Sequence, residues 1–108
     1  MAKTFDQNQL EQLAGGDKAF EKELLQLFAA DTENSLSQLA IAISMEDPSA
    51  VRSLAHYIKG ASANVGAVGM AKIAAQLEAL AKSGNLTSAA SSLRQLQLLH
   101  GQVKRMAR

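Results

Sequence analysis

The sequence contains no cysteine, no tryptophan and a single proline, Pro48. Without cysteine, the chain can form neither a disulfide nor a thiolate metal site, which is compatible with a reducing compartment. Ala and Leu dominate, whereas aromatic and β-branched residues are few, and this composition favours helix throughout the chain. These absences predict an all-α protein.

An excess of one charge is also missing, because 11 Lys and Arg residues are balanced by 10 Asp and Glu residues. The formal net charge of +1 gives no large field for nucleic acid. A short basic cluster at Lys104, Arg105 and Arg108 is more typical of a solvated helix end. Apolar runs span only a few residues, so we expect no membrane segment, no signal peptide within Met1 to Leu10, and a cytoplasmic location.

The 108 residues suffice for one domain (1–108). Helix-capping residues, glycines and the proline divide it into five helical segments. A short helix near the N-terminus should stop at Gly15-Gly16, and Asp17 is a candidate N-cap for a long helix ending near Met45. The pair Asp47-Pro48 predicts the start of a third helix, over about 48–65. Gly66 and Gly69 then permit a reversal, and two further helices follow, separated by a break at 83–85.

Each long segment carries an apolar stripe with helical spacing. The expected core residues are, in the second helix, Phe20, Leu24, Leu27, Phe28, Leu36, Leu39 and Ile43; in the third, Val51, Leu54, Ile58, Ala61 and Val65; in the fourth, Met70, Ile73, Ala74, Leu77, Leu80 and Ala81; and in the last, Leu93, Leu96, Leu99 or His100, and Val103. Short connections force antiparallel neighbours. The predicted fold is therefore an antiparallel up-and-down four-helix bundle with a short extra N-terminal helix.

His56 should face away from the core, because the apolar stripe of its helix lies roughly 140–220° from it. The side chains predicted to share its face are Arg52, Ser53, Lys59, Gly60 and Ala63, none of them large and apolar. An exposed histidine beside small residues and a cation is typical of a reaction site for another protein. We therefore expect Arg52, Ser53, Gly60 and Ala63 to form a partner-binding surface around His56.

Neutral imidazole is a good nucleophile near pH 7, and a phosphoryl group on a ring nitrogen is readily passed on. Lys59 follows His56 at i+3, where its ammonium can neutralise phosphate charge in the product and in the transition state. Gly60 costs a helix about 1 kcal/mol relative to Ala. On the exposed His56 side the bundle does not need that space, whereas an approaching partner does.

Glu78 is the candidate partner for the second ring nitrogen. If the third and fourth helices reverse around Ala67, His56 lies eleven positions before it and Glu78 eleven positions after it. Glu78 could then accept from Nδ1–H, which makes Nε2 the nucleophile, or contact Lys59, or remain a solvated carboxylate. Ser62 flanks the buried stripe, where a bond to its own helix is favoured over phosphate contact. His100 lacks a neighbouring cation at i+3 and is interpreted as a structural or surface residue.

The segment from Ala55 to Gly84 resembles the histidine-containing phosphotransfer (HPt) domain family. The family signature is A-H-x-(hydrophobic)-K-G-x-S-x-x-(hydrophobic)-G, followed by a helix that ends in a Leu-Glu pair. The matching residues are Ala55, His56, Ile58, Lys59, Gly60, Ser62, Val65 and Gly66, with Leu77 and Glu78 downstream. The resemblance extends over nearly the whole chain, with Lys82 as a minor departure where many members have Arg.

This resemblance implies a phosphocarrier in a two-component phosphorelay. His56 would exchange a phosphoryl group with the aspartate of receiver domains, which belong to response regulators or hybrid histidine kinases. Lys59 would steady the phosphate, Gly60 would leave room, and the receiver would supply Mg²⁺. We expect no cofactor or metal on this chain and no ATP-dependent self-phosphorylation, because it lacks a P-loop, a glycine-rich nucleotide loop and an acidic Mg²⁺ cluster. A monomer is expected.

Three other interpretations stay open at this point. The chain could be an interaction module in which His56 is never phosphorylated, although the joint presence of His56, Lys59 and Gly60 argues against that. It could be the phosphoacceptor domain of a chemotaxis-type kinase, a class that usually carries further kinase domains on the same chain. A metal or haem site has little support, since the chain has two histidines, no cysteine and no His-x-x-x-His spacing.

Overall fold

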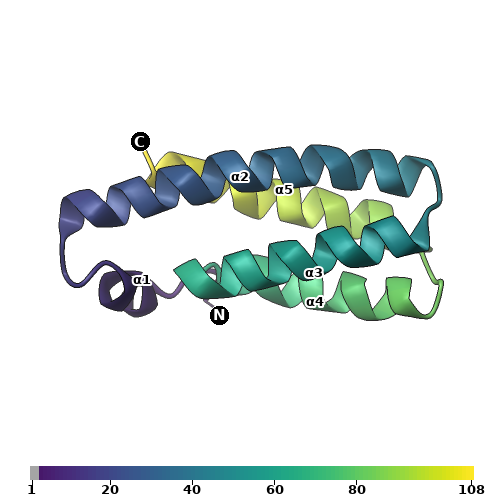
Figure 1. Cartoon of the computed structure of the whole chain (residues 1–108), viewed down its shortest axis with the longest axis horizontal. Coiled ribbons are helices and arrows are strands. Elements are labelled where there is room, and N and C mark those ends of the chain that lie inside the picture. Colours follow the sequence, from purple (N-terminus) through teal and green to yellow (C-terminus); the bar gives the residue numbers. More distant parts are fainter. Residues whose placement is uncertain (1–2) are drawn as a thin grey trace.

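The computed structural model describes residues 3–108, which form five helices in the order α1 (Gln7–Leu13), α2 (Lys18–Ser44), α3 (Pro48–Val65), α4 (Val68–Lys82) and α5 (Ala89–Met106). The four long helices alternate in direction, and α1 lies across one end of them (Figure 1). This arrangement confirms the predicted up-and-down four-helix bundle with an extra N-terminal helix. Among the helices of residues 3–108, none has the length and apolar character needed to cross a membrane.

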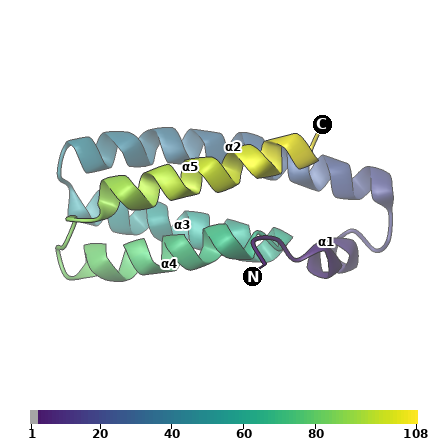
Figure 2. The same ribbon diagram turned by 180° about the vertical axis from the view of Figure 1, so that it is seen from behind.

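The long helices form a four-cornered bundle. α3 packs against α2 and, most extensively, against α4, while α5 closes the bundle by contacting α2 and α4. Seen from behind, α5 and α4 lie side by side in front of α2 and α3 (Figure 2). Within residues 3–108, the backbones of α3 and α5 do not approach each other closely, so these helices occupy opposite corners. The outward side of α3 is therefore remote from α5.

Aspartate side chains cap the first three helices. Asp17 accepts from the Phe20 N–H at 3.1 Å, and Asp47 accepts from the Ala50 N–H at 3.1 Å, with Pro48 in the first turn of α3. Such caps satisfy backbone donors that lack a partner inside the helix. Both predicted N-caps are thus confirmed, and α3 spans the predicted residues. Asp6 caps α1 in the same way.

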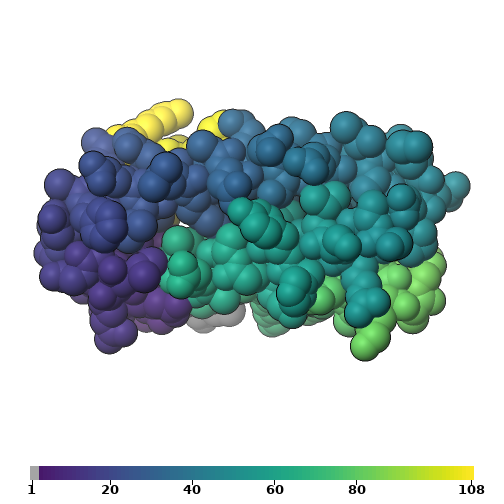
Figure 3. Space-filling view, in the orientation of Figure 1, coloured from purple at the N-terminus to yellow at the C-terminus, as the bar shows by residue number. Residues whose placement is uncertain are grey.

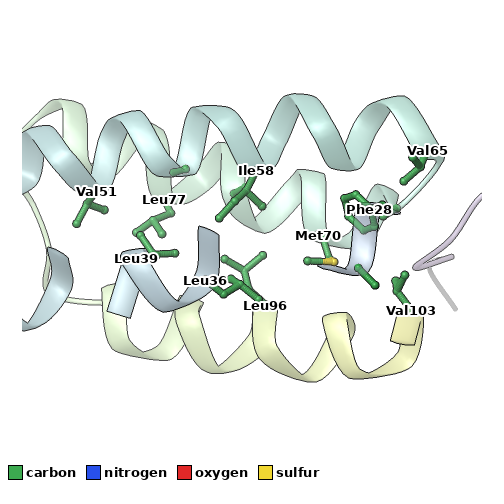
Figure 4. Packing of buried hydrophobic residues seen from close by; sticks show 14 of the residues in the cluster. Phe28, Leu36, Leu39, Val51, Ile58, Val65, Met70, Leu77, Leu96 and Val103 are labelled. Atoms are coloured by element: carbon green, nitrogen blue, oxygen red, sulfur yellow. The ribbon is translucent and has the colours of Figure 1, made fainter. Parts of the chain in front are cut away.

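The core runs the length of the bundle along its axis (Figure 4). Its most buried large apolar side chains come from α1 and all four long helices: Leu10, Leu39, Val51, Ile58, Met70, Leu77 and Leu96. On α3 the predicted stripe is confirmed, because Val51, Ile58 and Val65 are buried and Leu54 and Ala61 pack against them. Burying side chains of this size contributes about 1.5–3 kcal/mol each before conformational entropy is counted.

The predicted stripe of α2 is wrong at two positions. Phe20 and Leu27 are exposed, whereas Leu25, between them, is buried. On a helix these two residues lie about 80° and 100° from Phe28, on the flank opposite Leu25. The face of α2 that is actually buried includes three polar residues, Glu21, Thr32 and Ser35. A search for apolar residues at helical spacing cannot find such positions.

Polar contacts tie α2 to its neighbours. Glu21 is buried yet bound, since its carboxylate accepts from Gln7 at 3.0 Å and lies 3.2 Å from the Lys18 ammonium. His100, buried in α5, donates from Nε2 to the Ala29 carbonyl of α2 at 2.7 Å. A carbonyl oxygen can only accept, so this contact assigns the proton to Nε2. Of the two interpretations of His100, structural or surface, the structural one is confirmed. His100 is also the buried residue of the pair Leu99 and His100, since Leu99 is only partly buried.

The N-terminal segment is bound to the turn between α3 and α4. The Asp6 N–H donates to the Gly66 carbonyl at 2.7 Å, and the Gly69 N–H donates to the Thr4 carbonyl at 3.0 Å. Gln9 of α1 donates from its side-chain amide to the carbonyls of Ala63 and Asn64. These carbonyls belong to the last turn of α3, where the usual donors four residues further along the helix are missing. α1 therefore completes the C-terminal end of the helix that carries His56.

We predict that Gly66→Ala destabilises the bundle far more than Gly84→Ala. Both glycines have positive φ, 94° and 78°, so either substitution costs about 1–2 kcal/mol in backbone strain. A Cβ at Gly84 would meet nothing within 4 Å, whereas one at Gly66 would lie 2.5 Å from the Asp6 carbonyl oxygen. The clash should add about 1–3 kcal/mol. Urea unfolding of both variants measures the difference, and equal losses would show that the N-terminal segment does not press on Gly66.

Candidate functional site

His56 projects from the middle of α3 into solvent. Its side chain is 67% exposed, while Val51 and Ile58, on the opposite side of the helix, are 0% and 1% exposed. The geometry expected from the helical period is thus observed. The ring is accessible to another protein over most of its surface.

Glu78 of α4 holds the His56 ring. Its Oε2 lies 2.7 Å from His56 Nδ1, and the glutamate side chain is 19% exposed. An ionised carboxylate can only accept a hydrogen bond, so Nδ1 carries the proton and the neutral ring has its lone pair on Nε2. The contact therefore selects both the tautomer and the ring orientation that make Nε2 the nucleophile.

Lys59 shares the same carboxylate. Its Nζ lies 2.7 Å from Glu78 Oε1, so both glutamate oxygens are engaged. The hydrogen bond from Lys59 and then that from His56 lower the pKa of Glu78, which outweighs the opposing effect of desolvation. Glu78 is consequently ionised at neutral pH. Of the alternatives that the sequence left open for Glu78, the contact with Nδ1 and the contact with Lys59 both occur.

The α3–α4 turn brings these groups together. Gly66 ends α3 in the left-handed region, its N–H donates to the Ala63 carbonyl, and the Ala67 N–H donates to the Ser62 carbonyl at 2.8 Å. This is the Schellman arrangement, which favours glycine because a side chain is strained at that φ. The reversal places Glu78 opposite His56, as counting eleven residues either way from Ala67 predicts.

The residues expected to meet a partner surround the imidazole. Arg52 and Ser53 line a shallow hollow together with His56 and Glu78. Gly60 is exposed, and a Cβ placed on it would meet nothing within 4 Å, so the bundle itself does not require a glycine there. Ala63 is exposed one turn further along, where its carbonyl accepts from Gln9. Their partner-binding role remains a prediction.

The expected contact of Ser62 is not observed. Its hydroxyl is fully buried and has no hydrogen-bond partner among residues 3–108, in place of the predicted bond to its own helix. Ser62 packs inside the bundle, away from the exposed face that carries His56. The basic cluster near the C-terminus is solvated as expected, and Lys104 pairs there with Glu33 at 3.1 Å.

One contact beside His56 was missed from the sequence. The hydroxyl of Tyr57 donates to Asp31 Oδ2 of α2 at 2.5 Å, and this hydrogen bond raises the pKa of Tyr57. The tyrosine side chain stays half exposed next to the imidazole. α3 is thus joined to both neighbouring helices beside His56, by Glu78 on one side and Asp31 on the other. A lone tyrosine next to His56 was the available signal, but its partner is 26 positions away.

The absence of a bound metal or cofactor on this chain remains a prediction. Within residues 3–108, no group of three or more His, Asp or Glu side chains is placed to hold a metal ion. Glu78 is already engaged by two cationic or donor groups, which leaves it poorly suited as a ligand.

Comparison with known proteins assigns the class. A family model described as the Hpt domain matches residues 23–106, and the chain belongs to the Hpt domain family. Membership supports a histidine phosphotransfer role in phosphorelays, and Hpt proteins are phosphocarriers rather than kinases.

Two solved structures share the fold. Histidine-containing phosphotransfer protein B (HptB) from Pseudomonas aeruginosa PAO1 aligns with a TM-score of 0.91 at 31% identity, over 99% of this chain and 93% of that one. The HPT domain of an Hpt sensor hybrid histidine kinase from Shewanella aligns with a TM-score of 0.75 at 17% identity, over 95% and 92% of the two chains. No curated protein sequence gives a significant match.

The shared carboxylate generates a prediction on pH. The folded-state pKa of Glu78 is lowered, so its charge stabilises the fold fully above the ordinary glutamate pKa of about 4.3. This contribution is lost as the pH falls through the lower, folded-state pKa. Glu78→Gln should therefore be less stable than the wild type at pH 7, and the difference should shrink as the pH falls through the folded-state pKa.

Urea unfolding at pH 7, 5, 4 and 3 measures this difference. The control is Glu23→Gln, which removes an exposed carboxylate from α2 and should show no such pH-dependent gap. A gap for Glu78→Gln that persists unchanged at pH 3 would contradict the assigned charge state.

Proposed function

We propose that this protein carries a phosphoryl group on His56 Nε2 and exchanges it with the aspartate of receiver domains. The observation that carries the proposal is the 2.7 Å contact between His56 Nδ1 and Glu78 Oε2. It leaves an exposed ring with its lone pair on the second nitrogen. Membership of the Hpt family supports phosphotransfer as the reaction of this nucleophile.

The transfer step balances without a proton leaving the ring. The Nε2 lone pair attacks phosphorus of the receiver's aspartyl phosphate, the bond from phosphorus to the carboxyl oxygen breaks, and aspartate leaves as a carboxylate. The proton stays on Nδ1, and the positive charge that develops on the ring faces the Glu78 carboxylate. Donation to a second receiver reverses these steps. Glu78 thus acts as the orienting and charge-stabilising group.

In this proposal Lys59 stabilises the negative charge of the phosphoryl group. In the unphosphorylated protein its ammonium lies on Glu78, and its side chain is 37% exposed. Bound there, the ammonium stands beside the imidazole, where an arriving phosphoryl group would bring negative charge. Sharing Lys59 between the carboxylate and the phosphate would favour the transition state, which carries its charge on the phosphoryl oxygens.

The remaining residues of the face provide access. Gly60 and Ala63 leave the approach to Nε2 open, while Arg52 and Ser53 lie beside it. We propose that these residues meet the receiver, that Mg²⁺ is held by the receiver, and that this chain uses no cofactor of its own. The chain would then contribute a nucleophile and its orientation, and the partner would contribute the activated phosphate.

The proposal predicts that His56 alone is labelled, at Nε2. Incubation with the small donor phosphoramidate, and separately with a panel of phosphorylated receiver domains, should give an acid-labile, alkali-stable phosphate. Phosphorus NMR identifies the substituted nitrogen and mass spectrometry the residue. His56→Gln should abolish labelling with a stability change within about 0.5 kcal/mol, because the side chain is exposed.

The control for this labelling is His100→Gln, which removes the other histidine but keeps an N–H donor for the Ala29 carbonyl. It should be labelled as the wild type is. Phosphate on His100, or full labelling of His56→Gln, would refute the proposed function.

Gly60→Gln should raise stability and block transfer from a receiver. Replacing a glycine inside a helix gains about 1 kcal/mol, and no neighbouring atom opposes a Cβ there. The longer side chain would nevertheless occupy the space through which the receiver's phosphate must approach. Single-turnover transfer from a phosphorylated receiver should therefore slow by about tenfold or more, a loss of at least about 1.4 kcal/mol.

The matched control is Gly101→Gln, at the helical glycine of α5, where a Cβ would meet only Arg105 at an ordinary 3.8 Å. It should gain stability similarly and leave transfer unaffected. Normal transfer by Gly60→Gln would show that clearance at this position is unimportant.

A further inference from the structure

Large exposed apolar side chains are concentrated on α2. Among residues 3–108, eight large apolar residues are exposed; three of them, Phe20, Leu27 and Ile41, lie on this one helix, and a fourth, Met45, is its C-cap. Three of the four are more than 60% exposed. Exposed apolar residues scattered singly need no explanation, but a group on one element marks a candidate interaction surface. We call these four residues the α2 ridge.

The α2 ridge occupies one side of its helix. At about 100° per residue, its four members fall within about 60° of one another around the axis. Asp31 projects from the same side, and it accepts the hydrogen bond from Tyr57 of α3. The ridge therefore borders α3 on the side where Tyr57, not Glu78, flanks His56. α2 and α3 lie next to each other on one face of the molecule (Figure 3).

The other neighbour of α3 offers a different surface. α4 contributes Glu78 to the His56 site, and its exposed positions are Lys72, Gln76, Ala79 and Lys82. Within the described residues, α4 has no large exposed apolar side chain. The surroundings of His56 are thus apolar toward α2 and polar toward α4.

An apolar hollow lies between α2 and α3, on the same side as the ridge. Its wall is mostly apolar: Ile41 and the C-cap residue Met45 line it from the α2 side, and Ala50 and Leu54 line it from α3. The polar side chains in the wall are Gln38 and Asp47. Ala50 precedes His56 by six residues, about 9 Å along the helix, and Leu54 precedes it by two. A hollow with mostly apolar walls is the kind of site that receives an anchoring side chain of a partner.

A partner that reaches His56 Nε2 must cover this region. Standard protein interfaces bury about 800 Å² per partner, which corresponds to a disc of about 16 Å radius. Along α3, Ala50 and Leu54 of the hollow lie within this radius of His56, and Tyr57 is the next residue in the sequence. Tyr57 is half exposed, and its bond to Asp31 restrains the ring before any partner arrives, which lowers the entropy lost on binding.

We propose that the receiver domain docks on the α2 side of His56, with Tyr57, Ile41 and Met45 as its apolar anchors. Asp31 is a positioning residue that holds Tyr57. The proposal rests on the proposed function, because it names the surface by which the same partner is recognised. The receiver should present aliphatic or aromatic side chains next to its phosphorylated aspartate. A second copy of this chain on the ridge would instead cover Tyr57 and obstruct access to His56.

The test uses the full chain and the receiver that transfers fastest in the panel described above. Ile41→Lys and Met45→Lys should each weaken the dissociation constant for that receiver by about tenfold or more, as expected for interface anchors. The matched control is Leu98→Lys, which changes an aliphatic residue of α5 that is 72% exposed, at the corner opposite α3. It should bind as the wild type does. Equal affinity of Ile41→Lys, Met45→Lys and Leu98→Lys would overturn the proposal.

A double-mutant cycle tests the role of Asp31. If Asp31 acts through Tyr57, then Asp31→Ala should weaken receiver binding in the wild type but add nothing to Tyr57→Phe, which lacks the hydroxyl. Tyr57→Lys should weaken binding more than Tyr57→Phe, because only the former removes the ring. Additive effects of Asp31→Ala and Tyr57→Phe would rule out the positioning role.

Two further measurements separate the outcomes. Sedimentation of the wild type should show a monomer, and a dimer that Ile41→Lys dissociates would assign the ridge to a second copy and overturn the proposal. Labelling by phosphoramidate needs no docked receiver. Loss of that labelling in parallel with affinity would mean that a substitution damaged the His56 site itself. If the wild type is labelled by neither donor, the proposed function fails first.

Discussion

The turn at Gly66 is the constraint on which the rest of the site depends. Gly66 sits in the left-handed region with the Asp6 carbonyl against it, a place where any side chain would be both strained and in contact. The turn sets the register of α4 against α3, the most extensive helix pair in the bundle. Because of that register Glu78 lies opposite His56, and the N-terminal segment, bound to the same turn, closes the end of α3.

A single carboxylate then organises the chemistry. Glu78 receives His56 through one oxygen and Lys59 through the other, so tautomer, ring orientation and the position of the nearest cation are set together. The low pKa of Glu78 keeps this arrangement charged at neutral pH. Across α3 the hydrogen bond from Tyr57 to Asp31 restrains the other side of the same face. His56 itself remains the exposed member of the group, free to meet another protein.

Prediction from sequence succeeded where the signal was local and failed where it depended on rotation of a helix. The cap at Asp47, the proline after it and the glycine at 66 act within a few residues of themselves, and the bounds of α3 followed from them. Phe20 and Leu27 were wrongly assigned to the core because buried Glu21 and Thr32 interrupt the apolar pattern of α2. The bond between Tyr57 and Asp31 was missed for a related reason. It requires the relative rotation of two helices, which no local pattern encodes.

The sequence by itself determined the helices, their antiparallel order and the exposure of His56, since hydrophobic period, caps and turns are properties of neighbouring residues. Counting residues from Ala67 also made Glu78 a candidate for the His56 site, but did not decide whether it contacts His56, Lys59 or solvent. Only the tertiary structure decided that Glu78 binds His56 and Lys59 together, that Ser62 is buried without a partner in the described residues, and that Asp31 holds Tyr57. Those contacts join residues on different helices or depend on how deeply a helix is packed. Their geometry is set by the packing of whole side-chain layers, which no single segment contains.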